Sequence, residues 1–590
     1  MTRPFGYHRR YLRVDVSTGE RSVIELAPSG LTDFVGGSGL GTHILRQETH
    51  GEYDALAPIA PLVFVFSPLV GSPLTTSAKF AVVAKSPLTH RLNDALASSH
   101  FAIAGKRTGF DAIVIVGRCN SPAILLIEPD EIRLESAAGL WGLKIPECES
   151  QLREKLPRGF RSAVIGPAGE NLVRYASISH DGRHAGRGGH GAVMGAKNLK
   201  AVCLRGDRQV EFAYLTKLVE YSRDLSKKSL GEATAKYREL GTVDNLVTFN
   251  RLGTLPTKNF QAGEFAEASR LAPEVLVPEG KRTRTSCAAC TIGCEHVFES
   301  KAGKPVRLEY ENLFALGPLC GVSDPETVLQ ASSLCDEYGM DTISTGVTIA
   351  FAMECSSRGL IDQKLSFGNA DHLLTAIESI ASRTGFGELL SQGTRAASRE
   401  IGQGSEEFAA HVKGLELPGY EPRALQMMGL GFAVNSRGAD HNRSGAYQVD
   451  FSDASDRFNA DPAHVRLAIQ TEDEATIMDS LILCKFLRGV FDDRMESMAE
   501  MLRLTTGSDV TGEDMLTTAS RIVTAKKRFN IQQGWTPEED TLPARFLNQP
   551  LEGGASTGAA LTADKLHELI RAYNLARGWS EDGVPEILSP

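Results

Sequence analysis

Three cysteines fall within eight residues near the middle of the chain, and their spacing restricts the fold more than any other feature of the sequence. Cys287, Cys290 and Cys294 form a C-x2-C-x3-C array in the segment CAACTIGC. Three thiolates on one short loop suit the irons of an iron–sulfur cluster, which needs a fourth ligand from elsewhere. We therefore expect a fold that brings a distant segment of the chain to this loop.

A zinc ion is the main alternative for the same array. His296 follows the last cysteine by two positions and would complete a Cys3His set, which zinc binds tetrahedrally. Three unrelated core cysteines are the remaining interpretation. The order of spacings is the reverse of the C-x3-C-x2-C array typical of radical enzymes that use S-adenosylmethionine, which argues against that class. Ten cysteines in 590 residues are not a disulfide scaffold, so metal or redox chemistry is the leading class.

Charge and hydropathy exclude other classes. The 63 Lys and Arg residues are dispersed and outnumbered by 73 Asp and Glu residues, so the basic footprint of a nucleic-acid-binding protein is missing. The first residues carry neither an apolar run nor a cleavage site of a signal peptide. The longest apolar stretch, residues 62–70, is about half as long as a membrane helix. We expect a cytoplasmic protein that contacts neither nucleic acid nor membrane.

The periodicity changes once along the chain. Short apolar or alternating runs broken by Gly and Pro, such as KFAVVAK and FDAIVIVG, predict a β-rich domain over residues 1–208. Helical periodicity begins after the charged stretch 205–211, and Pro418 with Gly419 marks a further break. The sequence therefore predicts an α+β protein with a β-rich base domain (1–208) and two mainly α-helical domains (209–416 and 417–590).

Two helices can be placed closely. Asp324 followed by Pro325 is a helix start, and apolar residues at helical spacing continue until Gly339. A second helix is expected over residues 342–356. Near the C-terminus, residues 551–562 (LEGGASTGAALT) predict an exposed loop before a closing helix.

Glycine-rich and aspartate-rich elements are candidate cofactor sites. Residues 184–198 contain five glycines and expose backbone groups of the kind that approach phosphate, although many tight turns look similar. The run 36–41 (GGSGLG) lacks the G-x-G-x-x-G spacing of a dinucleotide fold. Residues 336–341 (DEYGMD) and 479–484 (DSLILC) share one shape, which suggests two matched ligands. Their carboxylates suit the N–H groups of a pterin, whereas the simpler reading of Asp341 is a helix cap.

Together, these elements resemble the aldehyde ferredoxin oxidoreductase family of tungsten enzymes, and the similarity spans nearly the whole chain. The matching stretches are YLRVDVSTGE (11–20), FVGGSGLG (34–41), AKSPLT (84–89), GFDAIVIVGR (109–118), AGRGGHGAVMGAKNLKA (185–201), the cysteine array, EYE (309–311), DEYGMDTISTG (336–346), RGADHNRS (437–444), LILCKF (481–486) and RGWSEDGVP (577–585). The family holds one metal through two pterin cofactors beside a [4Fe-4S] cluster. Its β-rich first domain is covered by two helical domains.

The resemblance implies roles for particular residues. Cys484 would be the fourth cluster ligand, which disfavours zinc with His296. Asp336 and Asp341 would contact one pterin, and Asp479 with the Leu483 backbone the other. The Gly-rich run would pass the pterin phosphates and a bridging Mg²⁺. The implied cofactor-binding residues are Lys79, Ala185, Gly186, Arg187, Gly188, Asp336, Asp341, Arg443, Asp479 and Leu483, and the implied metal ligands are Cys287, Cys290, Cys294 and Cys484.

Glu311 and His441 match the two polar residues that the family places near its metal. Without that context, each would be read as structural. With it, His441 is expected to donate a hydrogen bond to a substrate carbonyl, and Glu311 to move the proton lost as an aldehyde becomes an acid.

Three positions depart from the family pattern. Ile482 stands where the second aspartate element usually carries Gly, so we expect a differently shaped turn. Lys79 stands where the family often has an Arg between pterin and cluster, and Lys is a point donor rather than a bidentate fork. Ser98 and Ser99 replace a Gly-Gly pair, which puts the fit around the cofactor there in doubt.

The expected function is oxidation of an aldehyde to a carboxylic acid at a tungsten or molybdenum bis-pterin centre, with electrons passed through a [4Fe-4S] cluster to ferredoxin or a similar carrier. The alternatives are a subunit of a low-potential reductase, for example one that reduces aromatic thioesters with partner subunits, and a homologue without catalysis. A homodimer is considered because many relatives are dimers. Lys281, Arg282 and Arg284 either steer an acidic carrier or form a solvated basic loop.

Overall fold

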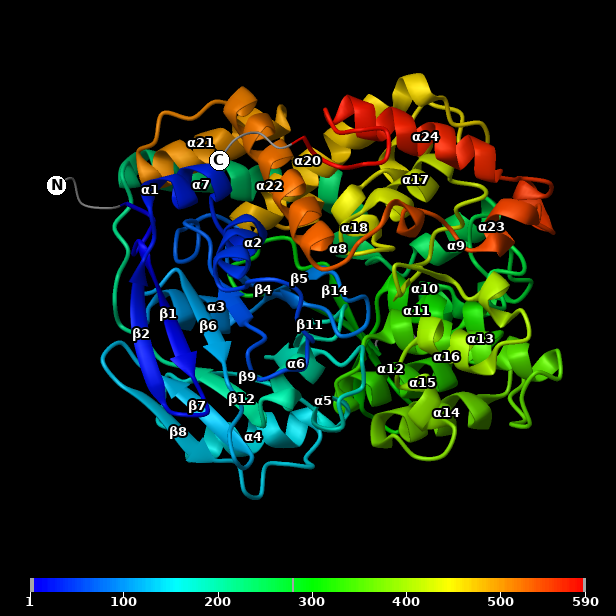
Figure 1. Ribbon diagram of the computed structural model, residues 1–590, viewed down its shortest axis with the longest axis horizontal. Coiled ribbons are helices and arrows are strands. Elements are labelled where there is room, and N and C mark those ends of the chain that lie inside the picture. The colour runs from blue at the N-terminus through cyan, green and yellow to red at the C-terminus, as the bar shows by residue number, and fades with distance from the viewer. Residues whose placement is uncertain (1–4, 278–280, 587–590) are drawn as a thin grey trace.

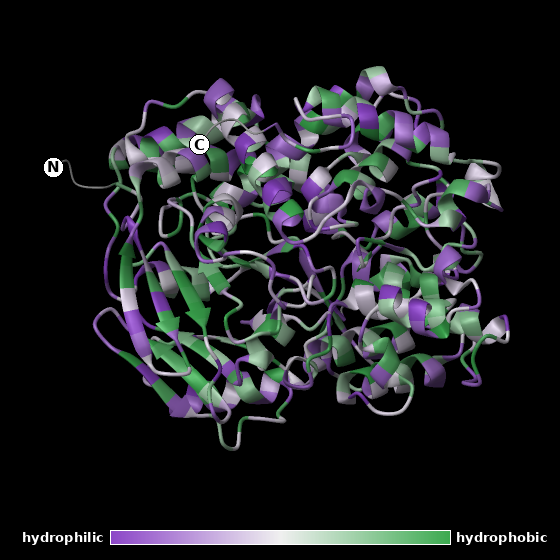
Figure 2. Cartoon of the chain, viewed as in Figure 1, coloured by the Kyte–Doolittle hydropathy of each residue, from purple (hydrophilic) through white to green (hydrophobic). Residues whose placement is uncertain are grey.

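The computed structural model describes residues 5–277 and 281–586. Two β-sheets formed by the first third of the chain lie on one side of the molecule, and helices from the remaining chain form the other side and the top (Figure 1). In Figure 2 the strands are mainly hydrophobic, and hydrophilic residues band the helices. The predicted α+β fold class is confirmed. No helix within the described ranges combines the length and apolar character needed to cross a membrane.

The N-terminal part contains two six-stranded sheets. The first has the order β2-β1-β6-β3-β4-β5, with β1 parallel to β6 and the other pairs antiparallel. Its strands are β1 Arg10–Asp15, β2 Glu20–Glu25, β3 Leu62–Val65, β4 Lys79–Lys85, β5 Leu92–Ser98 and β6 Ala112–Val116. β3 and β6 are buried along their whole length, which explains their unbroken apolar sequences.

The second sheet has the order β11-β10-β9-β12-β7-β8. Its strands are β7 Ala123–Ile127, β8 Ile132–Ser136, β9 Arg161–Val164, β10 Ile178–His180, β11 Arg183–Ala185 and β12 Leu199–Leu204. One apolar cluster contains side chains from both sheets, including Phe64, Val82, Leu125 and Val202, so the two sheets share a core. The helices within this part are α1 Pro28–Phe34, α2 Gly37–Gln47, α3 His100–Lys106, α4 Ile145–Lys155, α5 Pro167–Glu170 and α6 His190–Ala196.

Helices dominate from α7 onward. They are α7 Leu215–Lys228, α8 Ala235–Glu239, α9 Asn245–Arg251, α10 Pro273–Leu276, α11 Tyr310–Leu316, α12 Pro325–Tyr338, α13 Thr342–Ser357, α14 Ala370–Ser382, α15 Gly387–Leu390, α16 Thr394–Ile401, α17 Gln426–Val434, α18 His441–Ser444, α19 Tyr447–Asp450, α20 Val465–Leu481, α21 Arg494–Thr506, α22 Gly512–Gln532, α23 Ala544–Asn548 and α24 Ala563–Ala576. The largest apolar cluster contains residues from both sides of position 416. The division into three domains stays a prediction.

The predicted helix signals are confirmed at α12 and α13. The Asp324 side chain accepts a hydrogen bond from the Thr327 backbone N–H at the start of α12, and Gly339 ends this helix in the left-handed conformation. Asp341 caps α13 by accepting from the backbone of Ile343 and Ser344. Near the C-terminus, residues 551–562 hold one short 3-10 turn before α24.

The helical region also contains two small sheets that the helical periodicity did not predict. β13 Arg282–Thr285, β14 Glu295–Glu299 and β15 Pro305–Arg307 form an antiparallel sheet, and β16 His411–Val412 pairs with β17 Leu415–Glu416. These strands are too short and too polar to give a clear alternating pattern. The first of the two sheets matters for the site, because the cysteine array lies in the loop between β13 and β14.

A buried ion pair connects α13 to α23. The Arg545 guanidinium donates to both carboxylate oxygens of Glu354 and to the Asn259 carbonyl, while Asn259 Nδ2 donates to Glu354 Oε2 at 2.7 Å. The side chains of Arg545 and Glu354 are only 3% and 1% exposed. Arg358, one helical turn after Glu354, also reaches Glu354 Oε1 at 2.6 Å, but its side chain is 47% exposed, so the buried charge depends mainly on Arg545.

We predict that Arg545→Met lowers the free energy of unfolding by about 3 kcal/mol, because it leaves the buried Glu354 carboxylate with Arg358, whose side chain is 47% exposed, as its remaining ion-pair partner. Urea unfolding followed by tryptophan fluorescence measures the change. Arg571→Ala is the matched control, since Arg571 and its partner Glu581 are 54% and 56% exposed and such pairs contribute about 1 kcal/mol or less. Equal effects of the two substitutions would contradict the prediction.

Candidate cofactor site

One cavity of about 410 Å³ collects the four predicted cluster cysteines. Cys287, Cys290 and Cys294 reach it from the loop between β13 and β14, and Cys484 reaches it just after the turn that ends α20. The structure thus brings together thiols that lie almost 200 positions apart in the sequence, as the fold requires if one group is to bind all four. Their role as ligands stays a prediction.

Two threonines that the sequence did not single out hold the cysteine segments together. The Thr76 backbone N–H donates to the Ala289 carbonyl at 2.6 Å, and the Cys484 backbone N–H donates to Thr76 Oγ1 at 3.2 Å. Thr75 Oγ1 accepts from the Thr291 backbone N–H at 3.0 Å. Segment 75–76 therefore fixes the position of Cys484 relative to the array. These hydrogen bonds could not be predicted from the sequence, because threonine is common in loops and no pattern marks Thr75 or Thr76.

The four thiols affect one another electrostatically. Burial raises the pKa of the Cys290 thiol, and burial followed by the nearby Cys484 and Glu309 raises that of Cys294. Thiolates at these positions therefore need a positively charged partner. The side chains surround the cavity instead of meeting at a point: within the described chain, no three His, Cys, Asp or Glu side chains are placed to hold a single metal ion.

His296 lies apart from this cavity. Its ring sits on β14 with Nε2 3.4 Å from the Tyr237 carbonyl, and it is not among the residues that line the cavity. Burial lowers the pKa of His296. The structure therefore does not bring His296 together with the four cysteines, as the zinc alternative requires.

The Gly-rich segment forms another wall. Gly186, directly after β11, lines the cavity, and a Cβ added there would meet no atom within 4 Å, so its backbone faces open space. Gly188 has a φ of +88°, and an added Cβ would lie 2.2 Å from the Asn93 side chain. Glycine is therefore required at position 188 by both backbone conformation and space. Ala185 is buried at the end of β11.

Arg187 ties the Gly-rich segment to the helical region. Its guanidinium donates to the Ala439 carbonyl at 2.7 Å and to the Glu416 carbonyl. It also lies 3.3 Å from an Asp341 oxygen and 3.8 Å from an Asp440 oxygen. Arg187 therefore connects the cavity wall at Asp341 to the segment that carries His441.

Both residues of the first aspartate element line the cavity. Asp336 Oδ1 lies 3.2 Å from His184 Nε2, and His184 in turn bonds Ser179 through Nδ1 at 2.7 Å. Asp341 uses its carboxylate to cap α13 and to pair with Arg187. The capping interpretation of Asp341 is thus confirmed, and a contact with a pterin stays a prediction for both residues.

The second aspartate element ends in Cys484. Asp479 Oδ1 is 3.0 Å from Lys485 Nζ, and Asp479 Oδ2 is 3.0 Å from Arg443 Nη1 without the alignment of a hydrogen bond. Lys79 Nζ, at the cavity wall, donates to the Leu483 carbonyl at 3.4 Å. Lys79 therefore links β4 to the residue before Cys484.

The expected change of turn shape at Ile482 is wrong. Ile482 adopts φ +66° and ψ +39° at the end of α20, and Gly339 at the matching position adopts φ +78° and ψ +55°. Both conformations are left-handed, which costs a β-branched residue such as Ile482 about 1–2 kcal/mol. The turns at the ends of the two aspartate elements therefore have the same backbone geometry.

The serines that replace the Gly-Gly pair have separate places. Ser98 lines the cavity, and Ser99 caps α3.

Glu311 and His441 face each other beside the cavity. Glu311 Oε1 lies 3.5 Å from His441 Nδ1, and Glu311 Oε2 accepts from the Gly419 backbone N–H at 3.0 Å. The Tyr420 ring stacks on the imidazole with centroids 4.8 Å apart. Burial raises the pKa of Glu311 to about 8 and lowers that of His441 to about 3, so both are uncharged at neutral pH.

A charge network around Asp94 was missed by the sequence reasoning. Asp94 on β5 is buried, and it lies 3.1 Å from Lys526 Nζ, 3.3 Å from Arg443 Nε and 3.8 Å from Arg437 Nη1. Burial alone would raise its pKa, but these cations hold it well below the usual range of a carboxyl. The only signal was a charged residue inside an otherwise uncharged strand, LNDALAS.

Several buried polar atoms on residues that do not line the cavity lack a hydrogen-bond partner, as does Nη1 of Arg307, which does line it. Among the described residues, the following lack a hydrogen-bond partner: Asn93 Oδ1, Glu311 Oε1, Glu416 Oε2, Arg437 Nε, His441 Nδ1 and Asp479 Oδ2. Each such atom costs about 1–3 kcal/mol if it stays unsatisfied. Within the cavity itself, the four thiols, the Arg307 side chain and the open Gly186 backbone fit a group that binds thiolates and accepts hydrogen bonds.

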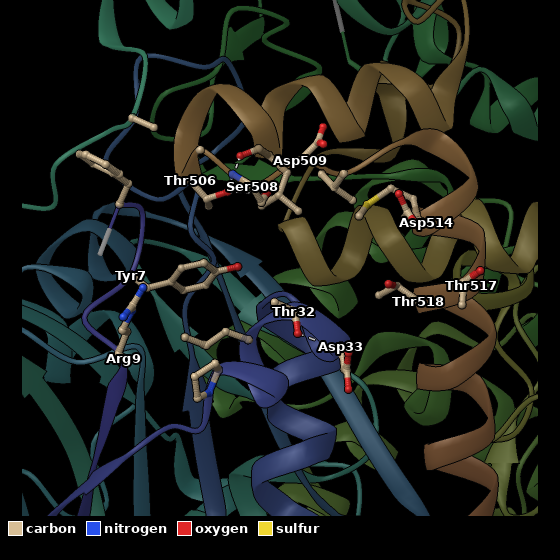
Figure 3. A pocket seen from close by; sticks show the side chains of 18 of the residues that line it. Tyr7, Arg9, Thr32, Asp33, Thr506, Ser508, Asp509, Asp514, Thr517 and Thr518 are labelled. Carbon is tan, nitrogen blue, oxygen red and sulfur yellow. Dashed lines mark hydrogen bonds between the residues drawn. The ribbon is translucent and has the colours of Figure 1, made fainter. Parts of the chain in front are cut away.

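A larger cavity, of about 690 Å³, lies elsewhere, between the N-terminal segment, α1 and the region around α21 and α22 (Figure 3). Tyr7, Thr32, Asp33 and Thr506 are among its lining residues, and none of the predicted site residues is. It contains no Cys or His side chain. By volume alone, this cavity would be the candidate cofactor site. The four thiols favour the smaller cavity instead.

Comparisons with known proteins identify the family. Residues 11–206 match the family model described as aldehyde ferredoxin oxidoreductase, N-terminal domain, and residues 219–587 match the model for domains 2 and 3. A tungsten-containing aldehyde ferredoxin oxidoreductase of Pyrococcus furiosus is 35% identical over 98% of this chain and 97% of the relative. The WOR-like subunit of an aliphatic sulfonate oxidoreductase from the same organism is 27% identical over 99% of this chain and 96% of that relative.

A solved structure shows the same fold. It is the active site complex BamBC of benzoyl coenzyme A reductase, with a TM-score of 0.82 and 22% sequence identity, covering 99% of this chain and 96% of that chain. The family resemblance seen in the sequence is confirmed. The chain belongs to the aldehyde ferredoxin oxidoreductase family and is an oxidoreductase.

Proposed function

We propose that this protein oxidises an aldehyde to a carboxylic acid at a tungsten or molybdenum bis-pterin centre and passes the electrons through a [4Fe-4S] cluster to ferredoxin or a similar carrier in the cytoplasm. The observation that carries the proposal is the cavity lined by four thiols, which also reaches Asn312 and Asn442, the sequence neighbours of the Glu311–His441 pair. Support also comes from 35% identity to a curated tungsten-containing relative over nearly the full length of both chains.

In this proposal, Cys287, Cys290, Cys294 and Cys484 hold the cluster. The pterin contacts fall to Asp336 and Asp341 on one side and to Asp479, Arg443 and the Leu483 backbone on the other. Lys79 lies between them, and Ala185, Gly186, Arg187 and Gly188 form the wall proposed to pass the pterin phosphates and a Mg²⁺ ion. When bound, the metal centre accepts two electrons and the cluster passes them on singly.

The chain's own residues bind the substrate and move its proton. His441 is neutral because burial lowers its pKa to about 3, so it can donate a hydrogen bond to a carbonyl through one ring N–H. Oxidation of an aldehyde to an acid takes one oxygen from water and releases two protons with the two electrons, and the facing Glu311 must be ionised to accept one of these protons. The 3.5 Å separation of Glu311 Oε1 and His441 Nδ1 keeps donor and acceptor on the same side of the substrate.

The alternative is a catalytic subunit of a low-potential reductase that needs partner subunits. The 22% identity of the benzoyl coenzyme A reductase structure supports the shared fold only. Aldehyde oxidation is favoured because the tungsten-containing aldehyde ferredoxin oxidoreductase is 35% identical to this chain, compared with 22% for the benzoyl coenzyme A reductase structure. Turnover by the isolated chain distinguishes the two functions, since the alternative requires partners.

The proposed electron acceptor is an acidic protein. Arg282 and Arg284 lie just before the first cluster cysteine, and each donates only to a backbone carbonyl, Glu239 and Arg238 respectively. Lys281 is already paired with Glu299. The two arginines therefore retain positive charge for a partner close to the loop where electrons leave.

We predict that anaerobically purified protein contains about four irons and one tungsten or molybdenum per chain, and that Cys484→Ser lowers the iron content and removes the electron paramagnetic resonance signal of the reduced cluster. Cys320→Ser is the control, because Cys320 is buried and bonds only the Ala315 and Gly346 carbonyls. One zinc without iron in the native protein would overturn the cluster assignment.

Glu311→Gln and His441→Asn are each expected to lower the rate of aldehyde-dependent viologen reduction by about 10²–10⁴-fold, the usual contribution of acid–base catalysis. Metal and iron contents should stay unchanged, since neither side chain is proposed as a ligand. Glu299, which is half-buried and pairs with Lys281 at the surface, provides the control substitution Glu299→Gln. Unchanged turnover in both variants would remove these residues from the mechanism.

The pH dependence follows from Glu311. Its pKa of about 8 means that it carries a proton below that pH and accepts one only when ionised. We therefore predict that kcat/KM rises with pH and levels off near pH 8, falling about tenfold per unit below it. In Glu311→Gln the residual rate should lose this dependence. An ascending limb that persists in this variant would assign the titration to another group.

A further inference from the structure

A separate cavity of about 620 Å³ opens between the sheet domain and the helical region. Its walls are segment 87–91 before β5, Arg174, and the exposed side of α16, which lies near α15 in Figure 1. Glu539 closes it from the C-terminal part of the chain. It shares no lining residue with the cavity that holds the cysteines, and none of the residues assigned above lines it.

Four arginines line this cavity with little opposite charge. Arg91 is paired with Glu539. Arg174 donates to Gln392 Oε1 at 3.1 Å and to the Pro87 carbonyl at 3.4 Å. Arg395 donates to the carbonyls of Lys413 at 2.9 Å and Leu88 at 2.7 Å. The hydrogen-bond partners of both are therefore uncharged, although Glu539 acts on Arg395, and Asp54 on Arg174, from a greater distance.

Arg399 adds a further positive charge. It lies one helical turn after Arg395 on α16, a spacing at which like charges repel. Within the described part of the chain, Arg399 has neither a hydrogen bond nor an ion pair, and the remaining lining carboxylate, Glu400, has no ion pair. Three guanidinium groups thus converge on one cavity without a paired carboxylate.

Burial and repulsion between the positive charges of this cavity lower the pKa values of Arg395 and His90. Burial and then the neighbouring Arg399 lower the pKa of Arg395 to about 10. Partial burial and then the charge of Arg395 lower the pKa of His90, at the cavity rim, to about 4. A bound anion would reverse this repulsion. The planar donor fork of Arg matches the oxygens of phosphate and carboxylate groups.

We propose that Arg174, Arg395 and Arg399 form a binding site for a phosphate-type oxyanion. Inorganic phosphate itself fills only a small part of 620 Å³, a volume in the range of pockets that hold whole small molecules. The site therefore has room for a phosphate group carried on an organic molecule. The proposal does not depend on the function assigned to the cysteine cavity.

The test is isothermal titration calorimetry of the purified holoenzyme at low ionic strength. Inorganic phosphate is the first probe, and phenyl phosphate the second. We expect one saturable site per chain that weakens as salt is added, because screening reduces interactions between exposed charges. Tighter binding of phenyl phosphate identifies a phosphorylated organic molecule as the ligand, and equal affinity identifies free phosphate.

Arg399→Ala and Arg174→Gln are each expected to weaken binding about tenfold, the loss of one charge-assisted hydrogen bond. Arg399 is exposed, and its replacement by Ala removes no hydrogen bond or ion pair among the described residues, so folding should be intact. Arg466→Ala is the matched control, since Arg466 is also an exposed helical arginine but lies outside these cavities. The absence of saturable binding, or an equal effect of Arg399→Ala and Arg466→Ala, would overturn the proposal.

Discussion

The position of the candidate site depends on one buried negative charge, that of Asp94. Its three cationic neighbours, Arg437, Arg443 and Lys526, all come from the C-terminal part of the chain, more than 340 positions away. A carboxylate this deeply buried is stable only with such partners, and the partners are stable only with it. Because Arg443 also reaches Asp479, the same charge fixes the second aspartate element. One residue on β5 therefore sets the distance between the sheets and the helices around the cavity.

Local features of this fold could be predicted from the sequence, whereas long-range ones could not. Asp324, Pro325 and Gly339 mark α12 because capping and helix termination depend on neighbouring residues. The strands β13 and β14 around the cysteine array were missed, since their polar residues give no clear period. The four cysteines could be selected by their chemistry and by family resemblance. Thr76 and Asp94 could not, because their roles arise only from partners that the fold brings close.

Burial reverses the ordinary charge states of the two proposed catalytic residues. In water a glutamate is ionised at neutral pH and a histidine is partly protonated. Here the carboxyl of Glu311 keeps its proton and the ring of His441 stays neutral. An uncharged pair avoids the cost of an unpaired charge and still offers one donor and one acceptor. The arginine cavity is the opposite case. Arg174, Arg395 and Arg399 keep their positive charge there, although no carboxylate of the described chain forms an ion pair with them.

The walls of the cysteine cavity come from segments between Thr76 and Phe486. Chain synthesis proceeds from the N-terminus, and the sheets that carry Lys79 and Gly186 can fold before the later walls exist. Cys484 is the last of the four thiols to leave the ribosome, long after the array at 287–294. A group that needs all four thiols therefore cannot be fully held during most of translation. Loading of the cavity must be a late event in the maturation of the protein.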